Sequence, residues 1–180
     1  MHRHVAFLRG VNLGPRRRVK NEDLRRHFEE MGFEDVATFR ASGNVIFAAP
    51  KREAESRLAK RIEAGLGERL GFEVTVYMRS VEEVAAIAAR EPFDPKLVAK
   101  SKGKLQVSLL TKRPSAAARK EALAHATDED LLAIEGRELY WLPRGGTRES
   151  DLDWRPIEAA LGPGTIRTMG TVEQVAAKYC

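Results

Sequence analysis

Several features that would point directly to a class of protein are missing from this sequence of 180 residues. A single cysteine, Cys180, excludes an intrachain disulfide and a cysteine-rich metal site, as is common in the reducing cytoplasm. No apolar run approaches the roughly 18 residues of a membrane-spanning helix. The first apolar run is interrupted by Arg9, which makes it too short for a secretory signal. We therefore predict a cytoplasmic protein that does not use a membrane as a partner.

Common catalytic and cofactor motifs are missing as well. The sequence has no G-x-x-x-x-G-K-[ST] or G-x-G-x-x-G loop, and no serine lies within G-x-S-x-G. The alternation of a strand would place His2 and His4 on one face, but no third metal ligand accompanies them. The acidic residues at 128–130 are more typical of a strand start than of a metal site. We predict no metal and no cofactor, and the sequence leaves open whether the protein is an enzyme.

Acidic residues are absent from the first 20 positions, where basic residues are frequent. The basic residues of this segment are Arg3, Arg9, Arg16, Arg17, Arg18 and Lys20. The chain has 31 basic and 26 acidic residues, so the other 160 positions carry 25 against 26, a net charge of −1. The net charge of +5 therefore arises in one short segment. Such a local positive potential attracts anionic ligands, although it also suits a solvated loop that only aids solubility.

Hydrophobic periodicity and turn residues predict the secondary structure. In the first part we expect a helix capped by Asn21 and ended by Gly32, and a second helix from Pro50 to about Leu70. The strands expected there are Val5–Arg9, Val36–Arg40, Val45–Ala48 and Phe72–Met78. In the second part the expected strands are Leu105–Leu110, Leu131–Glu135, Glu138–Leu142 and Thr165–Thr168. The helices expected there are Val81–Ala89, Ser115 to about Ala126, Asp151–Leu161 and one from Thr171.

Both parts follow the order β-α-β-β-α-β. The sequence therefore predicts an α+β fold of two tandem ferredoxin-like units with antiparallel sheets, followed by a C-terminal helix. We expect the first unit at residues 1–80, a helix and a linker loop at 81–104, and the second unit with the C-terminal helix at 105–180.

This topology brings two polar segments together. In a β-α-β-β-α-β sheet the first and third strands are antiparallel neighbours, about 5 Å apart. The exit from strand one at Arg9–Asn12 should therefore lie beside the hairpin Ser42–Asn44. Both segments contain glycines that expose backbone N–H groups, and the loop leads to a helix N-terminus, where anions are favoured. The alternative is that the glycines and Asn44 only serve turns, and that Arg9 only pairs with Glu34 or Asp35.

Recognition of RNA is the main competing interpretation, because the same element order serves RNA-binding modules that stack bases on exposed aromatic residues. Phe7 and Phe47 are candidates for such a shared face. However, the sequence lacks the aromatic RNA-binding motif of those modules, and both faces of strand one are apolar. We therefore expect a sheet that is covered on both sides, where buried aromatic rings cannot stack on bases.

Five stretches are similar to the bacterial domain-of-unknown-function family 1697, in the same order along nearly the whole chain. They are FLRGVNLG, FRASGNVIF, VYMRSVEEVAAIAAREPF, GRELYWLPRG and TIRTMGTVEQVA. The resemblance implies a two-part α+β fold of ferredoxin-like units and no particular activity. It places the recurrent family positions at Arg9, Gly10, Asn12, Gly14, Ser42, Gly43, Asn44, Arg167 and Thr171. This chain has Thr168, Met169 and Gly170 where the family often has Asn-Trp-Asn, so any contribution of that stretch to a site is altered here.

The leading hypothesis is a protein that binds a small phosphate- or carboxylate-bearing ligand at the predicted sheet edge. The residues proposed for this ligand are Arg9, Gly10, Asn12, Gly14, Ser42, Gly43, Asn44 and Arg167. The first alternative is a nucleic-acid-binding module that uses Arg16, Arg17, Arg18 and Lys20. The second is a protein-interaction or dimerisation module without a ligand, and the chain is expected to be a monomer or a homodimer.

Overall fold

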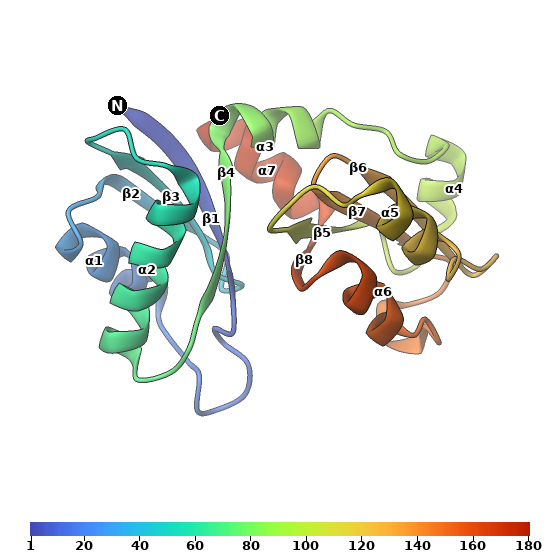
Figure 1. Ribbon diagram of the computed structural model, residues 1–180, viewed down its shortest axis with the longest axis horizontal. Helices are drawn as coiled ribbons and strands as arrows, with labels where there is room; N and C mark the ends of the chain where they lie inside the picture. The colour runs from blue at the N-terminus through green and yellow to red at the C-terminus, as the bar shows by residue number, and fades with distance from the viewer. The chain divides into compact units, whose positions relative to one another are not determined.

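The computed structural model describes residues 1–180, and it has an α+β fold with two four-stranded antiparallel sheets and seven α-helices. The chain divides into two compact units (Figure 1). Unit 1 comprises residues 1–85 and 175–180, and unit 2 comprises residues 86–174. The division falls within the two helices α3 (Val81–Ala88) and α7 (Met169–Tyr179).

Unit 1 contains the first sheet, which we call sheet A. Its strand order is β2-β3-β1-β4, and all neighbouring strands are antiparallel. The elements are β1 (His2–Arg9), α1 (Asn21–Glu30), β2 (Glu34–Phe39), β3 (Asn44–Ala49), α2 (Glu55–Leu70) and β4 (Thr75–Ser80). The expected adjacency of the first and third strands is therefore confirmed.

Helices α1 and α2 cover one face of sheet A (Figure 1). Their apolar residues recur at helical spacing, so each helix has a single face that can be buried. Phe28 of α1 packs against Phe47 of β3, with 5.4 Å between ring centroids, and Phe33 lies 4.6 Å from the same ring. Burial of these rings and of Ile62 in α2 supplies much of the hydrophobic stabilisation of unit 1.

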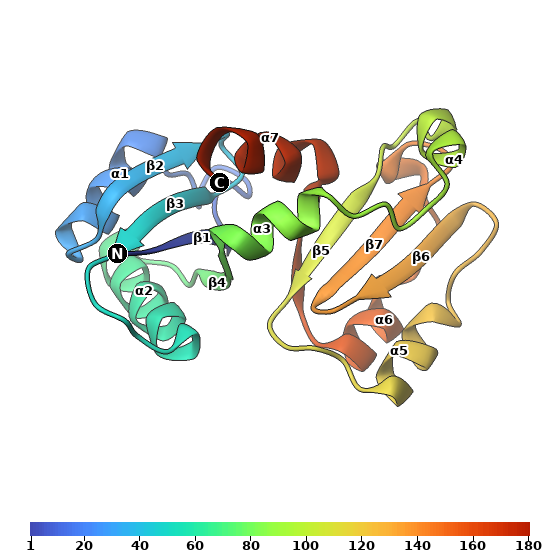
Figure 2. The ribbon, with the colours of Figure 1, turned by 90° about the horizontal axis from the view of Figure 1, so that it is seen from above.

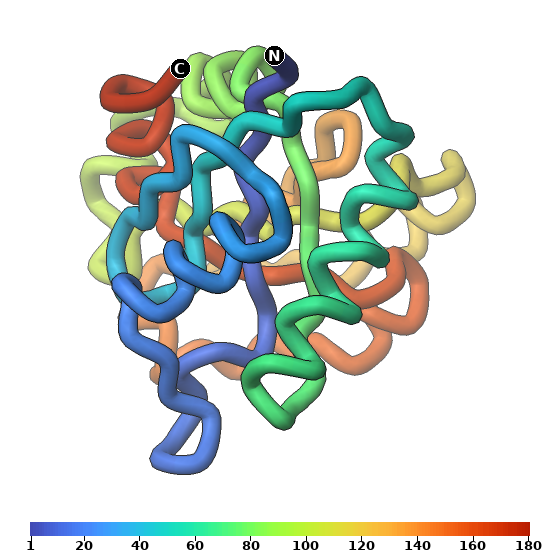
Figure 3. Tube along the Cα trace, turned by 90° about the vertical axis from the view of Figure 1, so that its left-hand side faces the viewer, coloured from blue at the N-terminus to red at the C-terminus, as the bar shows by residue number.

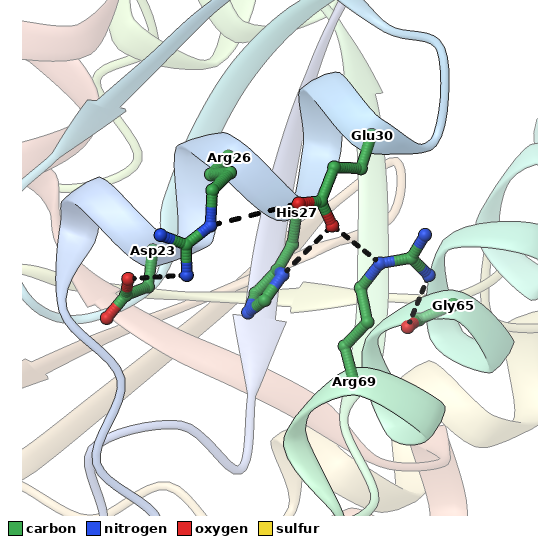
Figure 4. A network of polar contacts seen from close by, with 6 residues as sticks. All are labelled: Asp23, Arg26, His27, Glu30, Gly65 and Arg69. Carbon is green, nitrogen blue, oxygen red and sulfur yellow. Dashed lines mark hydrogen bonds and ion pairs between the residues drawn. The ribbon is translucent and has the colours of Figure 1, made fainter.

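A polar network also links α1 to α2 at the surface (Figure 4). Glu30 of α1 accepts a hydrogen bond from Nε of Arg69 in α2 at 3.3 Å. The ring of His27 and the guanidinium of Arg26 approach the same carboxylate at 3.7 and 3.8 Å. Because the side chains of Arg26 and Glu30 are exposed, the network adds far less than the apolar contacts beneath it.

The opposite face of sheet A is buried as well. Val5, Phe7, Ile46 and Tyr77 are each at most 1% exposed. The expectation that β1 is covered on both faces is therefore confirmed. The suggestion that Phe7 and Phe47 share a face is wrong, because Phe47 pairs with His4 in the antiparallel register, and strand alternation turns Phe7 the other way.

Unit 2 contains the second sheet, sheet B, with the order β6-β7-β5-β8. Helices α5 and α6 lie on one face of it (Figure 2), and Trp141 meets Trp154 of α6 edge-on at 5.0 Å between centroids. The elements are α4 (Pro95–Lys100), β5 (Gln106–Leu110), α5 (Ala116–Leu123), β6 (Asp130–Glu135), β7 (Glu138–Pro143), a 3-10 turn (Thr147–Glu149), α6 (Trp154–Leu161) and β8 (Gly164–Thr168).

Several expected element boundaries differ from the structure; for example, α6 begins at Trp154 rather than Asp151, and β4 is Thr75–Ser80 rather than Phe72–Met78. Lys20 rather than Asn21 is the N-cap of α1, and α2 begins at Glu55 rather than Pro50. The expected linker contains α4, where the Asp94 side chain accepts a hydrogen bond from the amide of Lys96 at 2.8 Å. Helix α7 begins at Met169 rather than Thr171.

None of the seven helices combines the length and the apolar character that crossing a membrane requires.

Candidate functional site

The end of β1 and the hairpin before β3 meet at one end of sheet A. Phe7 is opposite Asn44 in the register, and the amide of Leu8 donates to the carbonyl of Gly43 at 2.8 Å. Two segments about thirty residues apart in sequence are thus neighbours in space, as the strand order requires. Beyond them the loop between β1 and α1 extends past the end of the sheet (Figure 3).

Asn12 holds this loop to the hairpin. Its Nδ2 donates to the carbonyl of Ala41 at 2.6 Å, and its Oδ1 accepts from the amide of Val19 at 3.0 Å. Its backbone N–H donates to the carbonyl of Arg17 at 2.5 Å, and its φ of 55° lies in the left-handed region that asparagine tolerates. The polar groups of Asn12 are therefore used to close the loop, which makes Asn12 a scaffold residue.

Asn44 has a similar role inside the hairpin. It is fully buried, and its Nδ2 donates to the carbonyl of Phe39 at 2.8 Å and to Oγ of Ser42 at 2.9 Å. Gly43 beside it has a φ of 82°, and a Cβ at this position would lie 2.6 Å from Cγ2 of Val11. These residues shape the end of the sheet at the hairpin, and Ser42 itself is exposed.

The two glycines of the loop differ in their surroundings. A Cβ at Gly10 would lie 3.0 Å from the carbonyl oxygen of Glu73, so the backbone passes close to the entry of β4. Gly14, with a φ of 72°, has open space around it. Gly10 is thus required by packing and by its φ of 99°, whereas Gly14 is required only by its backbone conformation.

Arg9 is exposed at the last position of β1, opposite Thr75 of β4. By strand alternation it shares a face with Val5 and Phe7, away from α1 and α2. The basic residues of the loop, Arg16, Arg17, Arg18 and Lys20, are all exposed. Arg17 is fixed by a hydrogen bond to the carbonyl of Glu73 at 3.4 Å and by its position over the ring of Phe72 at 5.7 Å.

Strand β4 adds two residues to this face that the sequence analysis did not single out, Tyr77 and Arg79. The register places Tyr77 opposite Phe7 and Arg79 opposite Val5. Both side chains are 1% exposed, and the Tyr77 hydroxyl has no hydrogen-bond partner. The alternation in TVYMRS placed Thr75, Tyr77 and Arg79 on one face, which was the available signal.

Arg167 belongs to β8 in unit 2, where it is 7% exposed. Its Nη1 donates to Oγ1 of Thr165 at 2.8 Å and to the carbonyl of Ile166 at 3.0 Å. Burial lowers the pKa of Arg167 to about 10, so it remains a cation at neutral pH. Arg167 belongs to unit 2, whereas Arg9 belongs to unit 1.

Arg167 and Tyr140 occupy the same row of sheet B, because each pairs with Val107 of β5. The Tyr140 hydroxyl bonds Nη1 of Arg90 at 3.0 Å, and the same nitrogen donates to Oε2 of Glu138 at 3.0 Å. Burial raises the pKa of Tyr140. Unlike the hydroxyl of Tyr77, the hydroxyl of Tyr140 has a hydrogen-bond partner within its own unit, and it therefore has a structural role.

Unit 2 also has a cleft of about 590 Å³ that the sequence did not predict. Its lining includes five acidic residues, which are Glu129, Asp130, Glu149, Asp151 and Asp153. Oδ1 of the buried Asp130 accepts hydrogen bonds from Nε1 of Trp141 at 2.8 Å and from Oγ of Ser150 at 2.7 Å, so this carboxylate has a structural role.

Histidine, cysteine, aspartate and glutamate form no group of three or more that could hold a metal ion. The His4 ring lies against Phe47, with 5.6 Å between centroids, and burial lowers the pKa of His4.

Comparison with known proteins shows a family match and a similar fold. The family model described as "Protein of unknown function (DUF1697)" matches residues 1–140. No curated protein matches the sequence. Among solved structures, the conserved bacterial protein SP0830 from Streptococcus pneumoniae is similar, with a TM-score of 0.70 and 16% sequence identity. The alignment covers 98% of this chain and 97% of that protein, and at this identity the likeness concerns the fold alone.

Proposed function

The chain belongs to the DUF1697 family of proteins of unknown function, and we propose that it binds a small anionic ligand at the end of sheet A where Arg9 leaves β1. The convergence of the Arg9 exit with the hairpin of Gly43 and Asn44 is the observation that carries this proposal. The topology that supports it is β-α-β-β-α-β in both units, and we propose that each unit is ferredoxin-like.

The charge of the sheet face that includes Arg9 favours an anion. On this face, β1 and β4 contribute three guanidinium groups, from Arg3, Arg9 and Arg79, whereas β2 contributes a single carboxylate at Glu34, so the balance is positive. The exposed basic residues of the adjacent loop add to the same field. A surface of one sign concentrates ligands of the opposite sign and speeds their association.

Arg9 is the proposed anchor because a planar guanidinium can donate two parallel hydrogen bonds to two oxygens of one anion. The exposed hydroxyl of Ser42 and the backbone N–H groups near Gly10 and Gly14 are the further donors proposed for this edge. Asn12 and Asn44 hold the loop and the hairpin in place. A loop that is fixed before binding loses less conformational entropy when the ligand arrives.

Exchange of Arg9 for lysine tests the proposal, because the charge is kept while the planar fork is lost. We expect Arg9→Lys to weaken binding of inorganic phosphate and of nucleotides in a thermal-shift titration, since ligands raise the midpoint by stabilising the native state. The midpoint without ligand should change little, as is usual for exposed positions. Arg57→Lys, at an exposed position of α2, is the matched control.

Two results would contradict this function. The first is that none of the anions shifts the midpoint of the parent protein. The second is that Arg9→Lys lowers the stability strongly but leaves the ligand-induced shift intact, because Arg9 would then be a structural residue.

Binding of nucleic acid by the loop after β1 is the second candidate. The observation that favours it is the exposure of Arg16, Arg18 and Lys20, whose side chains form no ion pair or hydrogen bond in the chain. Lysine and arginine side chains of this kind contact phosphates without reading sequence. The loop has no aromatic side chain on which a base could stack, so contacts to the phosphate backbone would dominate.

A further inference from the structure

The hydroxyl of Tyr77 has no hydrogen-bond partner within the chain. The Tyr77 side chain is 1% exposed, and its hydroxyl oxygen is itself buried. Leaving a buried polar group unsatisfied is unfavourable, because the hydrogen bonds to water that it makes in the unfolded chain are lost without replacement. Phenylalanine would fill the same space without this cost. A tyrosine is explained if its hydroxyl acts on a group that is not part of the chain.

The register places Tyr77 next to the proposed anchor. Tyr77 is directly opposite Phe7 on β1, and Arg9 is two residues further along β1 on the same face. Such diagonal neighbours on adjacent strands have their Cα atoms roughly 7–8 Å apart, within reach of long and aromatic side chains. The row of Asn44, Phe7 and Tyr77 therefore borders the row of Arg9 and Thr75.

We infer that the Arg9 edge takes a phosphate monoester rather than a carboxylate, with the hydroxyl of Tyr77 as its third donor. This inference rests on the proposed function of the edge. A carboxylate has two oxygens, and a guanidinium in fork geometry engages both of them in one plane. The phosphoryl group of a monoester has three free oxygens in a tetrahedral arrangement, so its third oxygen points out of that plane and is available to a donor on the neighbouring strand.

The test compares parent and Tyr77→Phe with two probes, inorganic phosphate and acetate, by isothermal titration calorimetry at fixed ionic strength. We expect Tyr77→Phe to weaken phosphate binding by about tenfold or more, as for the loss of one hydrogen bond to a charged group. Acetate binding should not change. Thermal stability without ligand should stay the same or rise, because an unsatisfied hydroxyl has been removed. Tyr179→Phe, in α7 of the same unit, controls for the loss of a phenol elsewhere.

The outcomes separate this inference from the function on which it rests. If the parent binds phosphate, and Arg9→Lys weakens that binding while Tyr77→Phe does not, the inference fails and the proposed function stands. An equal loss for phosphate and acetate in Tyr77→Phe also overturns the inference, because the hydroxyl would not distinguish the two anions. A marked loss of stability overturns it too, since the hydroxyl would then have a structural role. Absence of phosphate binding by the parent contradicts both the inference and the proposed function.

Discussion

A single missing Cβ allows the hairpin to pack against the exit from β1. Gly43 has a φ of 82°, and a Cβ there would lie 2.6 Å from Cγ2 of Val11 and 3.0 Å from Cβ of Leu8. We expect Gly43→Ala to be destabilising for two reasons. The left-handed conformation costs a non-glycine residue roughly 1–2 kcal/mol, and the overpacking adds roughly 1–3 kcal/mol. Urea unfolding of the variant and of the parent measures the total loss in the free energy of unfolding.

Gly14→Ala is the matched control for this prediction. Gly14 also has a left-handed φ, of 72°, but nothing lies within 4 Å of its missing Cβ. This variant should therefore show only the conformational cost, roughly 1–2 kcal/mol. Equal losses for Gly43→Ala and Gly14→Ala would mean that the hairpin moves to admit the extra methyl, and that the close contact of the two segments is not rigid.

Individual residues of the site were predictable only as far as strand order fixes their place. The meeting of Arg9 with the 42–44 hairpin follows from the antiparallel pairing of β1 and β3, which the element order alone determines. The role of Asn12 was not predictable, because its partner, the carbonyl of Ala41, depends on the path of a loop. Tyr77 was missed because an aromatic residue in a strand is normally part of a core.

Among the elements, the helices α1 and α2 are linked by a carboxylate whose effect depends on pH. The hydrogen bond from Arg69 lowers the pKa of Glu30. Because the pKa is depressed in the folded state, the carboxylate stabilises the fold above the pKa of the unfolded chain, and this contribution is lost as the pH falls through the folded-state pKa. We expect Glu30→Gln to lower the urea midpoint at about pH 7 and to differ much less from the parent at about pH 3.

Glu29→Gln serves as the control for Glu30→Gln. Glu29 pairs only with Arg25 of the same helix, at 3.6 Å, so its loss leaves the contact between α1 and α2 intact and should have the smaller effect at neutral pH. A deficit in Glu30→Gln that is the same at both pH values would show that the carboxylate charge is not what links the two helices.

The kind and order of the elements could be predicted from the sequence, whereas helix starts could not. Strand alternation and helical periodicity depend on many residues, so they survive local exceptions. A helix start depends on one cap. At the start of α7, Oγ1 of Thr168 accepts the hydrogen bond from the amide of Thr171, although the helix was expected to begin at Thr171 itself. Asp94 before Pro95 was a cap signal within a segment expected to be a loop.

At the scale of the whole molecule, charge is distributed unevenly along the chain. The first 20 residues carry six basic and no acidic side chains, and the remaining 160 carry a net charge of −1. Four of these six basic residues lie in one exposed loop, and the hydrogen bonds of the Asn12 side chain hold the base of this loop together. A protein that needed positive charge only for solubility would gain as much from dispersed residues, so the concentration favours a localised anionic partner.

This concentration leads to a quantitative expectation for nucleic acid. If the loop binds single strands through phosphate contacts, the logarithm of the affinity should fall linearly with the logarithm of the salt concentration. Exchange of all four basic residues for alanine should reduce the magnitude of this slope by about 3, because each lost contact accounts for roughly 0.7. Fluorescence anisotropy with a labelled RNA oligonucleotide at several salt concentrations measures the slope. The exchanged residues are Arg16, Arg17, Arg18 and Lys20.

A second quadruple variant distinguishes the loop from basic charge in general. It exchanges four exposed basic residues elsewhere in unit 1 for alanine, so the net charge falls by the same amount. They are Lys51, Arg52, Arg57 and Lys60. If the loop is the contact surface, this variant should keep the slope of the parent, since counterions are released only where phosphates are contacted. Equal slopes in the two variants would assign the binding to net charge, and absence of RNA binding by the parent even at low salt would leave the small-anion site as the reason for the basic segment.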